Sequence, residues 1–321
     1  MNGAAPTLLL CSGTDDLSGL CGEFERAAAQ DCPGLRVLCW TPDTPTTELQ
    51  SVVAIAGWFV PMGLPARLPR LRLLASIGAG VEHLLRDPDL PPDVPVTRIV
   101  DPAQARGMAE YVLWAALHHH RGFDHMLAQQ TRREWRMPAQ RPALAFRVGI
   151  MGLGAMGAEV ARKLAAHGFE VHGWSRRPAA LDGVTSWAGP DAMQPFLAKL
   201  DMVVSLLPLT TETRGLFNAD WFAALKPGAV FVNCGRGDQL VVPALVDALR
   251  KGHVRAAVLD VFEHEPLPAD DPLWAEPGVI VTPHMASSAS VDAIAGQIVA
   301  NTARVLDGQV PVNAVDRARG Y

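Results

Sequence analysis

Short apolar runs, separated by polar stretches, recur along the first third of the chain. Runs of this length predict strands, and the spacing of apolar positions in residues 21–30 predicts a helix between the first two. The predicted strands cover residues 7–11, 36–40, 53–57, 73–77 and 96–98. Strands that alternate with helices are typical of a parallel α/β domain.

A second series of the same kind follows a Pro- and Asp-rich connection at 88–102 and one long predicted helix at 105–126. Its predicted strands cover residues 147–151, 170–174, 202–206, 229–233, 256–259 and 279–282, with a helix at 155–167. The last helical pattern, at 291–306, could reach back to the first series. We therefore expect a discontinuous domain of residues 1–104 and 289–321 around a continuous domain of residues 105–288.

Composition supports a folded chain and excludes two classes of partner. Of 321 residues, 49% are hydrophobic and 19% are charged, which is enough apolar material for two buried cores. The net charge of -5 gives no basic surface for nucleic acid. No apolar run approaches the roughly 18 to 20 residues that cross a bilayer, and the start lacks the pattern of a secretory signal. We expect a cytoplasmic protein with no membrane partner.

The cysteines and a run of histidines predict neither a disulfide framework nor a metal site. The five cysteines are odd in number and contain no C-x-x-C pair, so we expect reduced thiols. His118, His119 and His120 fall on a predicted helix, where consecutive side chains point in different directions. Three imidazoles so placed cannot bind one metal, and we expect a surface or interface role for them.

The most informative local motif lies between a predicted strand and a predicted helix. It reads G-x-G-x-x-G and comprises Gly152, Leu153, Gly154, Ala155, Met156 and Gly157. The first glycine permits a tight turn, the second lets the backbone approach a pyrophosphate, and the third allows close packing of helix on strand. Glycine turns also close ordinary strand-to-helix units, but the surrounding elements favour a dinucleotide site.

The second strand of this unit predicts which dinucleotide is bound. An NAD enzyme places Asp or Glu there, about 20 residues after the glycines, against the ribose hydroxyls. This chain has Ser175, Arg176 and Arg177 instead. A hydroxyl and two guanidiniums would accept a 2′-phosphate, which a carboxylate would repel. NADP(H) is therefore preferred, with NAD(H) possible, although the two arginines could also be solvent-facing turn residues.

Three further segments follow predicted strands of the second series. They read N-C-G-R-G at 233–237, L-D-V-F-E-H-E-P at 259–266 and V-T-P-H at 281–284. Reacting groups in open α/β sheets gather at the carboxyl ends of strands, so these segments should meet at one crevice. An Arg, a Glu and a His delivered there are the groups that reduction of a 2-oxo acid requires.

These segments, with G-L-G-A-M-G before them, resemble the D-isomer-specific 2-hydroxyacid dehydrogenase family. Further matches resemble its glyoxylate/hydroxypyruvate reductase A branch: W-S-R at 174–176, G-A-G-V-E at 78–82 and V-D-R-A-R-G-Y at 315–321. The resemblance implies two Rossmann-like domains with parallel sheets, one flavodoxin-like and one NAD(P)-binding. It also implies an active site in the cleft between them and a homodimer.

The resemblance assigns roles to the three charged residues. Arg236 would grip the carboxylate and carbonyl of the substrate, and His284 would give a proton to the carbonyl oxygen. Glu265 would hydrogen-bond the far side of that imidazole. Glu263 competes for this carboxylate role, but the following Pro266 and the family pattern favour Glu265. His284 could instead be a structural histidine after a proline.

Other candidates line the expected cofactor and substrate sites. The cofactor candidates outside the glycine and arginine segments are Leu207, Pro208, Cys234 and Asp260. Asp260 would help to hold the carboxamide of the cofactor, or could simply cap a turn. The substrate candidates in the first domain are Gly78, Ala79, Gly80 and Trp58. The glycine segment would offer backbone N–H groups to the substrate carboxylate, and Trp58 would border the pocket.

The resemblance implies NADPH-dependent reduction of glyoxylate to glycolate and of hydroxypyruvate to D-glycerate. One alternative keeps the chemistry and takes a bulkier 2-oxo acid. Another is a dinucleotide-sensing binding protein of the corepressor type, because some relatives with this fold act so. Trp135 follows the long predicted helix, in a stretch that related enzymes use for dimer contact, but core packing would explain it as well.

Overall fold

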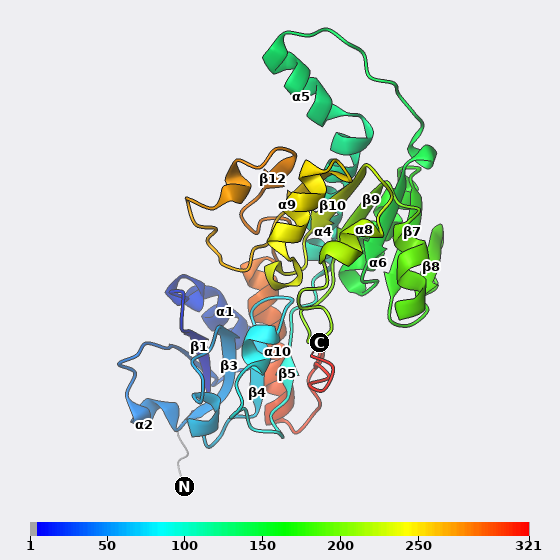
Figure 1. Cartoon of the computed structure of the whole chain (residues 1–321). Coiled ribbons are helices and arrows are strands. Elements are labelled where there is room, and N and C mark those ends of the chain that lie inside the picture. Colours follow the sequence, from blue (N-terminus) through cyan, green and yellow to red (C-terminus); the bar gives the residue numbers. More distant parts are fainter. Residues whose placement is uncertain (1–4, 321) are drawn as a thin grey trace. The chain divides into compact units, whose positions relative to one another are not determined.

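The computed structural model describes residues 5–320, so Tyr321, the last letter of the V-D-R-A-R-G-Y motif, lies outside the described residues. The chain divides into two compact units (Figure 1). Unit 1 comprises the residues up to Asp101 together with those from Ala289 onward, and unit 2 comprises Pro102–Ser288. Within the described residues, no helix has the length and apolar character that a membrane span needs.

Unit 1 contains a parallel sheet of five strands in the order β2-β1-β3-β4-β5. The strands are β1 (Thr7–Ser12), β2 (Arg36–Cys39), β3 (Val52–Trp58), β4 (Leu73–Ser76) and β5 (Val96–Thr97). This order is that of flavodoxin-like domains. The prediction of a parallel α/β fold is confirmed here.

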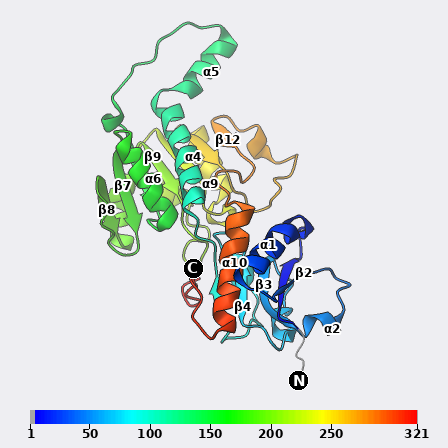
Figure 2. The same ribbon diagram turned by 180° about the vertical axis from the view of Figure 1, so that it is seen from behind.

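Helices cover unit 1 because β1 is apolar on both faces. Leu8 and Leu10 join one core cluster, while Leu9 and Cys11 join the other. The helices of this unit are α1 (Cys21–Asp31), α2 (Thr46–Leu49), α3 (Glu82–Leu85) and α10 (Val291–Leu306), with 3-10 turns at η1 (Ser18–Leu20) and η2 (Pro65–Arg67). Helices α1 and α10 pack side by side on one face of the sheet (Figure 2). The last helix therefore does return to the first unit.

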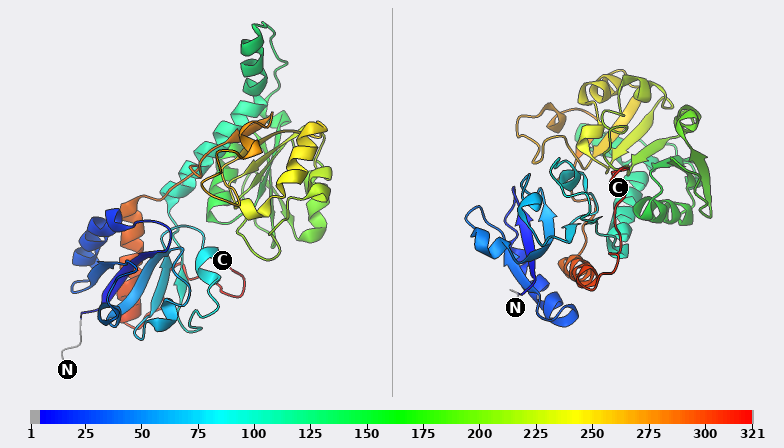
Figure 3. Two further views of the ribbon diagram at one scale, coloured as in Figure 1. Left: turned by 60° about the vertical axis from the view of Figure 1, so that its left-hand side comes forward. Right: turned by 90° about the horizontal axis from the view of Figure 1, so that it is seen from below.

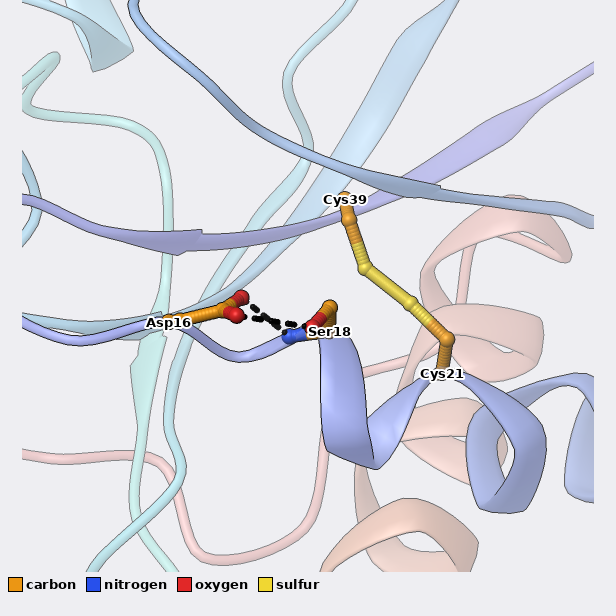
Figure 4. The surroundings of a disulfide bond; sticks show 4 residues. All are labelled: Asp16, Ser18, Cys21 and Cys39. Atoms are coloured by element: carbon orange, nitrogen blue, oxygen red, sulfur yellow. Dashed lines mark hydrogen bonds between the residues drawn. A yellow bond between two sulfur atoms is a disulfide. The ribbon is translucent and has the colours of Figure 1, made fainter.

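Two cysteines of unit 1 form a disulfide, so the expectation of reduced thiols is wrong for this pair. Cys21 begins α1 and Cys39 ends β2, and their sulfur atoms are bonded (Figure 4). The preceding turn is held by Asp16, whose carboxylate accepts hydrogen bonds from the N–H and hydroxyl of Ser18. The pairing joins separate elements that only the fold brings together, so cysteine spacing could not indicate it.

Unit 2 contains a parallel sheet of seven strands in the order β12-β11-β10-β9-β6-β7-β8. The strands are β6 (Arg147–Met151), β7 (Glu170–Ser175), β8 (Val184–Ala188), β9 (Met202–Ser205), β10 (Ala229–Asn233), β11 (Val254–Leu259) and β12 (Val279–Val281). Counted from β6, the order reverses between the first and fourth strands, as in dinucleotide-binding domains. Strand β8 was not among the predicted strands.

The helices of unit 2 include one departure from the sequence pattern. They are α4 (Pro102–His120), α5 (Phe123–Arg132), α6 (Ala155–Ala166), α7 (Met193–Leu197), α8 (Ala219–Ala223) and α9 (Val242–Arg250), with 3-10 turns at η3 (Ala143–Ala145), η4 (Pro190–Ala192), η5 (Gly237–Gln239) and η6 (Pro272–Trp274). The single helix predicted at 105–126 is wrong, because Gly122 adopts a φ of 71° and ends it. Helix α5 projects from the end of α4 as an arm (Figure 3).

A partly buried cluster of His119, Asp124 and Arg255 fixes the base of this arm. Nδ1 of His119 lies 3.2 Å from a carboxylate oxygen of Asp124, which also contacts the guanidinium of Arg255. Nη2 of Arg255 donates to the carbonyl of His119. His119 is buried, so the expected surface role does not hold for the middle histidine of the run.

Candidate active site

The glycine loop makes a tight turn between β6 and α6. Gly152 has a φ of 99°, and its N–H donates to the carbonyl of Trp174 at 2.9 Å. A Cβ on Gly152 would lie 2.9 Å from the carbonyl oxygen of Leu206. A Cβ on Gly157 would lie 1.8 Å from the carbonyl oxygen of Gly152, so any side chain there would push α6 off the loop. Both positions require glycine.

The same loop is open where a pyrophosphate would approach. Gly154 precedes α6, and no heavy atom lies within 4 Å of a Cβ built on it. The N–H groups of Ala155 and Met156 belong to the first turn of this helix, which favours an anion. Leu153 packs across the strand, where its side chain would meet a Cβ on Gly173 at 2.6 Å. The backbone therefore fits the phosphates of a dinucleotide.

The arginine segment follows β7 directly. The hydroxyl of Ser175 donates to the carbonyl of Arg177 at 2.6 Å, which folds the segment back on itself. The side chains of Arg176 and Arg177 are exposed. The pKa of Glu212 is lowered by its hydrogen bond with Thr210, with a smaller contribution from the positive charge of Arg176. The arginine segment therefore lies beside the loop that follows Leu207 and Pro208.

Two buried amides that the sequence did not single out shape the Arg236 loop. The side chain of Asn233 accepts from the N–H of Gly235 at 3.1 Å and donates to the carbonyl of Arg236 at 3.1 Å. Gln239 accepts from the N–H of Arg236 and donates to the carbonyls of Leu207 and Pro208, both at 3.0 Å. Both amides are fully buried. They tie the arginine loop to the 207–208 segment of the cofactor candidates.

The Arg236 loop also packs tightly against the segment that carries Glu265. A Cβ on Gly237 would lie 1.8 Å from the carbonyl carbon of Phe262, so the two backbones touch at this glycine. The guanidinium of Arg236 donates to the carbonyl of Gly235 at 2.7 Å, which restrains its direction. Its positive charge also contributes to lowering the pKa of Glu265. Arg236 and Glu265 are therefore electrostatic neighbours.

Glu265 and His284 form a direct pair. Nδ1 of His284 lies 2.7 Å from one carboxylate oxygen of Glu265, and the other oxygen accepts from the N–H of Phe262 at 2.8 Å. Burial raises the pKa of Glu265, but the hydrogen bonds from His284 and Phe262 and the charges of His284 and Arg236 outweigh it, and the pKa falls below its usual range. Since an ionised carboxylate only accepts, Nδ1 is the protonated nitrogen and Nε2 is left for a substrate.

Asp260 anchors the turn that carries His284. Its buried carboxylate accepts from the hydroxyl of Thr282 at 2.6 Å and from the N–H groups of Met285 and Ala286 at 2.9 Å each. The hydroxyl of Tyr111, on α4, lies 2.6 Å from that of Thr282. His284 itself has a φ of 50°, a conformation uncommon outside glycine, and these bonds hold it there. The carboxamide contact expected of Asp260 stays a prediction.

Cys234 is a buried residue whose thiol stays protonated. It is buried between the Arg236 loop and the sheet, and its N–H donates to the carbonyl of Ser205 at 3.1 Å. Burial, with help from the negative charge of Asp260, holds the pKa of its thiol well above the usual value. A thiol that stays protonated is neither a nucleophile nor a metal ligand.

In unit 1 the predicted substrate segment lies against Trp58. A Cβ on Gly78 would lie 3.0 Å from the indole ring, so glycine is needed for this approach. The N–H of Gly78 is already used, because it donates to the hydroxyl of Ser76 at 3.1 Å. The N–H groups of Ala79 and Gly80 have no hydrogen-bond partner within residues 5–320. These two groups, rather than that of Gly78, are the ones that could meet a carboxylate.

The strand order and glycine loop of unit 2 define a dinucleotide-binding α/β protein. Residues 113–286 match the family model of the D-isomer specific 2-hydroxyacid dehydrogenase, NAD binding domain. The glyoxylate/hydroxypyruvate reductase A of Serratia proteamaculans (strain 568) is 38% identical over 304 residues, covering 93% of this chain and 96% of that protein. The chain belongs to the D-isomer specific 2-hydroxyacid dehydrogenase family, which confirms the resemblance seen in the motifs.

Solved structures agree over almost the entire chain. A D-isomer specific 2-hydroxyacid dehydrogenase from Xanthobacter autotrophicus Py2, in complex with NADPH and MES, is 42% identical with a TM-score of 0.90, covering 99% of this chain and 100% of that one. An NADPH-dependent glyoxylate/hydroxypyruvate reductase from Sinorhizobium meliloti, in complex with NADP and sulfate, is 37% identical with a TM-score of 0.89, covering 98% and 100%. Both similarities span unit 1 and unit 2.

Proposed function

We propose that the protein reduces small 2-oxo acids, glyoxylate and hydroxypyruvate among them, to 2-hydroxy acids with NADPH. The observation that carries the proposal is the Glu265–His284 pair, at 2.7 Å, beside the loop that carries Arg236. The relatives named for this reaction, which match the chain over nearly its full length, support it further. Unit 2 carries the cofactor loop and the acid–base pair.

The roles follow from the charges. NADPH supplies the hydride when it is bound. The guanidinium of Arg236 holds the carboxylate and the carbonyl oxygen of the substrate and stabilises the negative charge that grows on that oxygen. His284 delivers a proton from Nε2 to the same oxygen, and Glu265 keeps the imidazole oriented through its hydrogen bond with Nδ1.

A panel of 2-oxo acids tests this proposal. We expect loss of reduced-nicotinamide absorbance with NADPH and either glyoxylate or hydroxypyruvate. Turnover of bulkier 2-oxo acids alone would overturn the substrate assignment. Tight NADPH binding with no turnover of any 2-oxo acid would favour a dinucleotide-sensing binding protein instead.

The preference for NADPH over NADH is assigned to the segment after β7. Arg176 and Arg177 are exposed and positively charged, and Ser175 offers a hydroxyl, so together they can bind a 2′-phosphate. We expect Arg176→Gln/Arg177→Gln to raise KM for NADPH at least about tenfold, because each charged hydrogen bond is worth about 1.5–3 kcal/mol. KM for NADH should change little. Arg162→Gln, an exposed arginine on α6, is the matched control, and equal losses for both cofactors would contradict the assignment.

We also propose a homodimer formed through the arm. Exposed apolar side chains gather on and after α5: Phe123, Leu127, Trp135, Met137 and Leu144. Trp135 is 100% exposed and Met137 is 91% exposed, so neither is buried within the chain. An apolar pocket of about 660 Å³ between α4, α5 and α6, lined in part by Trp114 and Leu117, offers matching surface on a second copy.

Removing the two most exposed apolar groups tests the dimer. We expect Trp135→Ser/Met137→Ser to raise the dimer dissociation constant by about 30-fold or more, as loss of a buried aromatic anchor does at interfaces. Sedimentation over a range of concentrations measures it. Trp274→Ser, at another exposed tryptophan of unit 2, should leave the dimer intact. A double variant that dimerises like the parent would exclude the arm as the interface.

A cytoplasmic location completes the proposal, since NADPH-dependent reduction draws on a cofactor pool that is kept reduced. The Cys21–Cys39 bond is the feature that speaks against this location. Disulfides are rare in cytosolic proteins and persist mainly in oxidising compartments.

A further inference from the structure

A second polar pocket lies in unit 2, at the opposite end of the sheet from the glycine loop. Its volume is about 340 Å³, and its walls come from the end of α4 and from the segments just before β6 and β7. The glycine loop and the Arg236 loop follow the carboxyl ends of strands, whereas this pocket lies at their amino ends. It is therefore separate from the cofactor and catalytic residues.

The pocket is lined by cationic and imidazole groups and by no carboxylate. Its polar lining residues are His120, Arg121, Gln140, Arg141 and His167. Nε of Arg121 donates to the side-chain oxygen of Gln140 at 2.7 Å, which positions the guanidinium without neutralising it. The excess of positive charge favours an anion.

The carboxylate that Arg141 contacts is shared with two other donors. Asp201 accepts from the ammonium of Lys226 at 2.7 Å, from the N–H of Arg147 at 2.9 Å and from the guanidinium of Arg141 at 3.3 Å. One carboxylate is thus shared by two cationic side chains and a backbone donor, and Arg141 makes the longest of the three bonds. Arg141 also stacks over the ring of Phe146, which leaves its edge free to donate elsewhere.

His120 adds an unsatisfied group to the pocket. Its Nδ1 is buried and has no hydrogen-bond partner within the part of the chain that the structure describes. The ring is held between Phe146 and Phe169, with ring centroids 5.4 and 5.5 Å away. Burial lowers the pKa of His120, and the charges of Arg141 and Arg121 lower it further, while Asp201 opposes them. An anion would relieve this repulsion and could accept a hydrogen bond from the ring.

We propose that this pocket binds a phosphate group, either free or carried by a small metabolite. Two guanidiniums can each donate two parallel hydrogen bonds to phosphate oxygens, and a phosphate dianion matches their combined charge. The volume exceeds that of phosphate alone, and Leu117, Ala143 and Phe169 form an apolar side that suits a short carbon chain. The site is independent of the reaction proposed above, because it uses none of the residues of that site.

Calorimetry on the NADPH-saturated protein tests the proposal, because saturation fills the 2′-phosphate site first. Inorganic phosphate and glycerol 3-phosphate are titrated separately, with ionic strength held constant by chloride. We expect both to bind, and tighter binding of the ester would identify a small metabolite rather than free phosphate as the ligand. Arg121→Gln/Arg141→Gln should raise Kd at least about tenfold, whereas Arg162→Gln should not change it.

The outcome that overturns the proposal involves the catalytic arginine. If phosphate binding is lost in Arg236→Gln and kept in Arg121→Gln/Arg141→Gln, the anion occupies the active site and the pocket binds nothing. Absence of binding to the parent protein overturns it equally. An NMR titration of the parent protein complements the variants. The resonance of the His120 ring, assigned by its loss in His120→Gln, should shift as phosphate is added. An unmoved resonance would contradict binding at this pocket.

Discussion

Replacing His284 by Ala is expected to lower kcat for 2-oxo acid reduction by about 100- to 10,000-fold, the usual contribution of a general acid. The imidazole is held by Glu265 through Nδ1, so its Nε2 is the atom that would deliver the proton. The cofactor contacts are assigned to other residues, those of the glycine loop and the arginine segment, so NADPH affinity should stay nearly constant. Single-turnover kinetics and fluorescence titration of NADPH separate the two effects. An unchanged rate would refute the role of His284.

The neighbouring glutamates supply a matched pair of variants for the same test. Glu265→Gln removes the charge opposite the imidazole and should lower kcat, whereas Glu263→Gln should not, because the bond to His284 comes from Glu265 alone. The lowered pKa of Glu265 predicts how the stabilisation from this pair depends on pH. The ionised carboxylate stabilises the folded protein fully above the ordinary carboxyl range, and this stabilisation is lost as the pH falls through the lowered pKa. An equal loss in both variants would contradict the assignment.

Replacing Arg236 by Gln is expected to lower kcat/KM for glyoxylate by about 100- to 1,000-fold, the range seen when a donor to a developing oxyanion is removed. Asn233 and Gln239 fix the loop through its backbone, so the variant should fold and bind NADPH. Arg236→Lys keeps the charge but loses the forked geometry and should recover only part of the activity. Steady-state kinetics with glyoxylate measure both, and an unaltered KM and kcat would exclude contact with the substrate.

Elements with strong local signals could be predicted from the sequence. Strand β6 and strand β10 begin and end at their predicted residues, because each is a compact apolar run bounded by polar or glycine positions. Helix α10 also has its predicted bounds, since its apolar spacing is regular and Ser290 caps its start. The family motifs then led to Arg236, Glu265 and His284.

The departures arise where tertiary structure decides. Gly122 sits within a regular helical pattern, and only its left-handed conformation ends α4. Strand β8 is only partly buried and mixes polar with apolar residues, so no strand pattern marks it. Cys21 and Cys39 meet because α1 and β2 are neighbours in the fold.

The hydrogen bonds that support the site could not be predicted from the sequence either. Asn233 bonds within its own loop, whereas Gln239 bonds to the carbonyls of Leu207 and Pro208 on another loop, and a single sequence carries no sign of such a partner. The hydroxyls of Tyr111 and Thr282 meet although the two residues are 171 positions apart in the sequence, and no local sequence pattern indicates such a contact. Family motifs give the reacting side chains, whereas the hydrogen bonds that hold them follow from packing.

We propose that the guanidinium of Arg236 and the glutamate-paired imidazole of His284 hold an anionic keto acid for reduction. A crystal structure with NADPH and oxamate, an unreactive 2-oxo acid analogue, tests it most directly. We expect the guanidinium of Arg236 to bind the oxamate carboxylate, with Nε2 of His284 within hydrogen-bond reach of the amide oxygen that stands in for the keto oxygen of a substrate. Oxamate bound elsewhere, or Nε2 turned away from that oxygen, would contradict it.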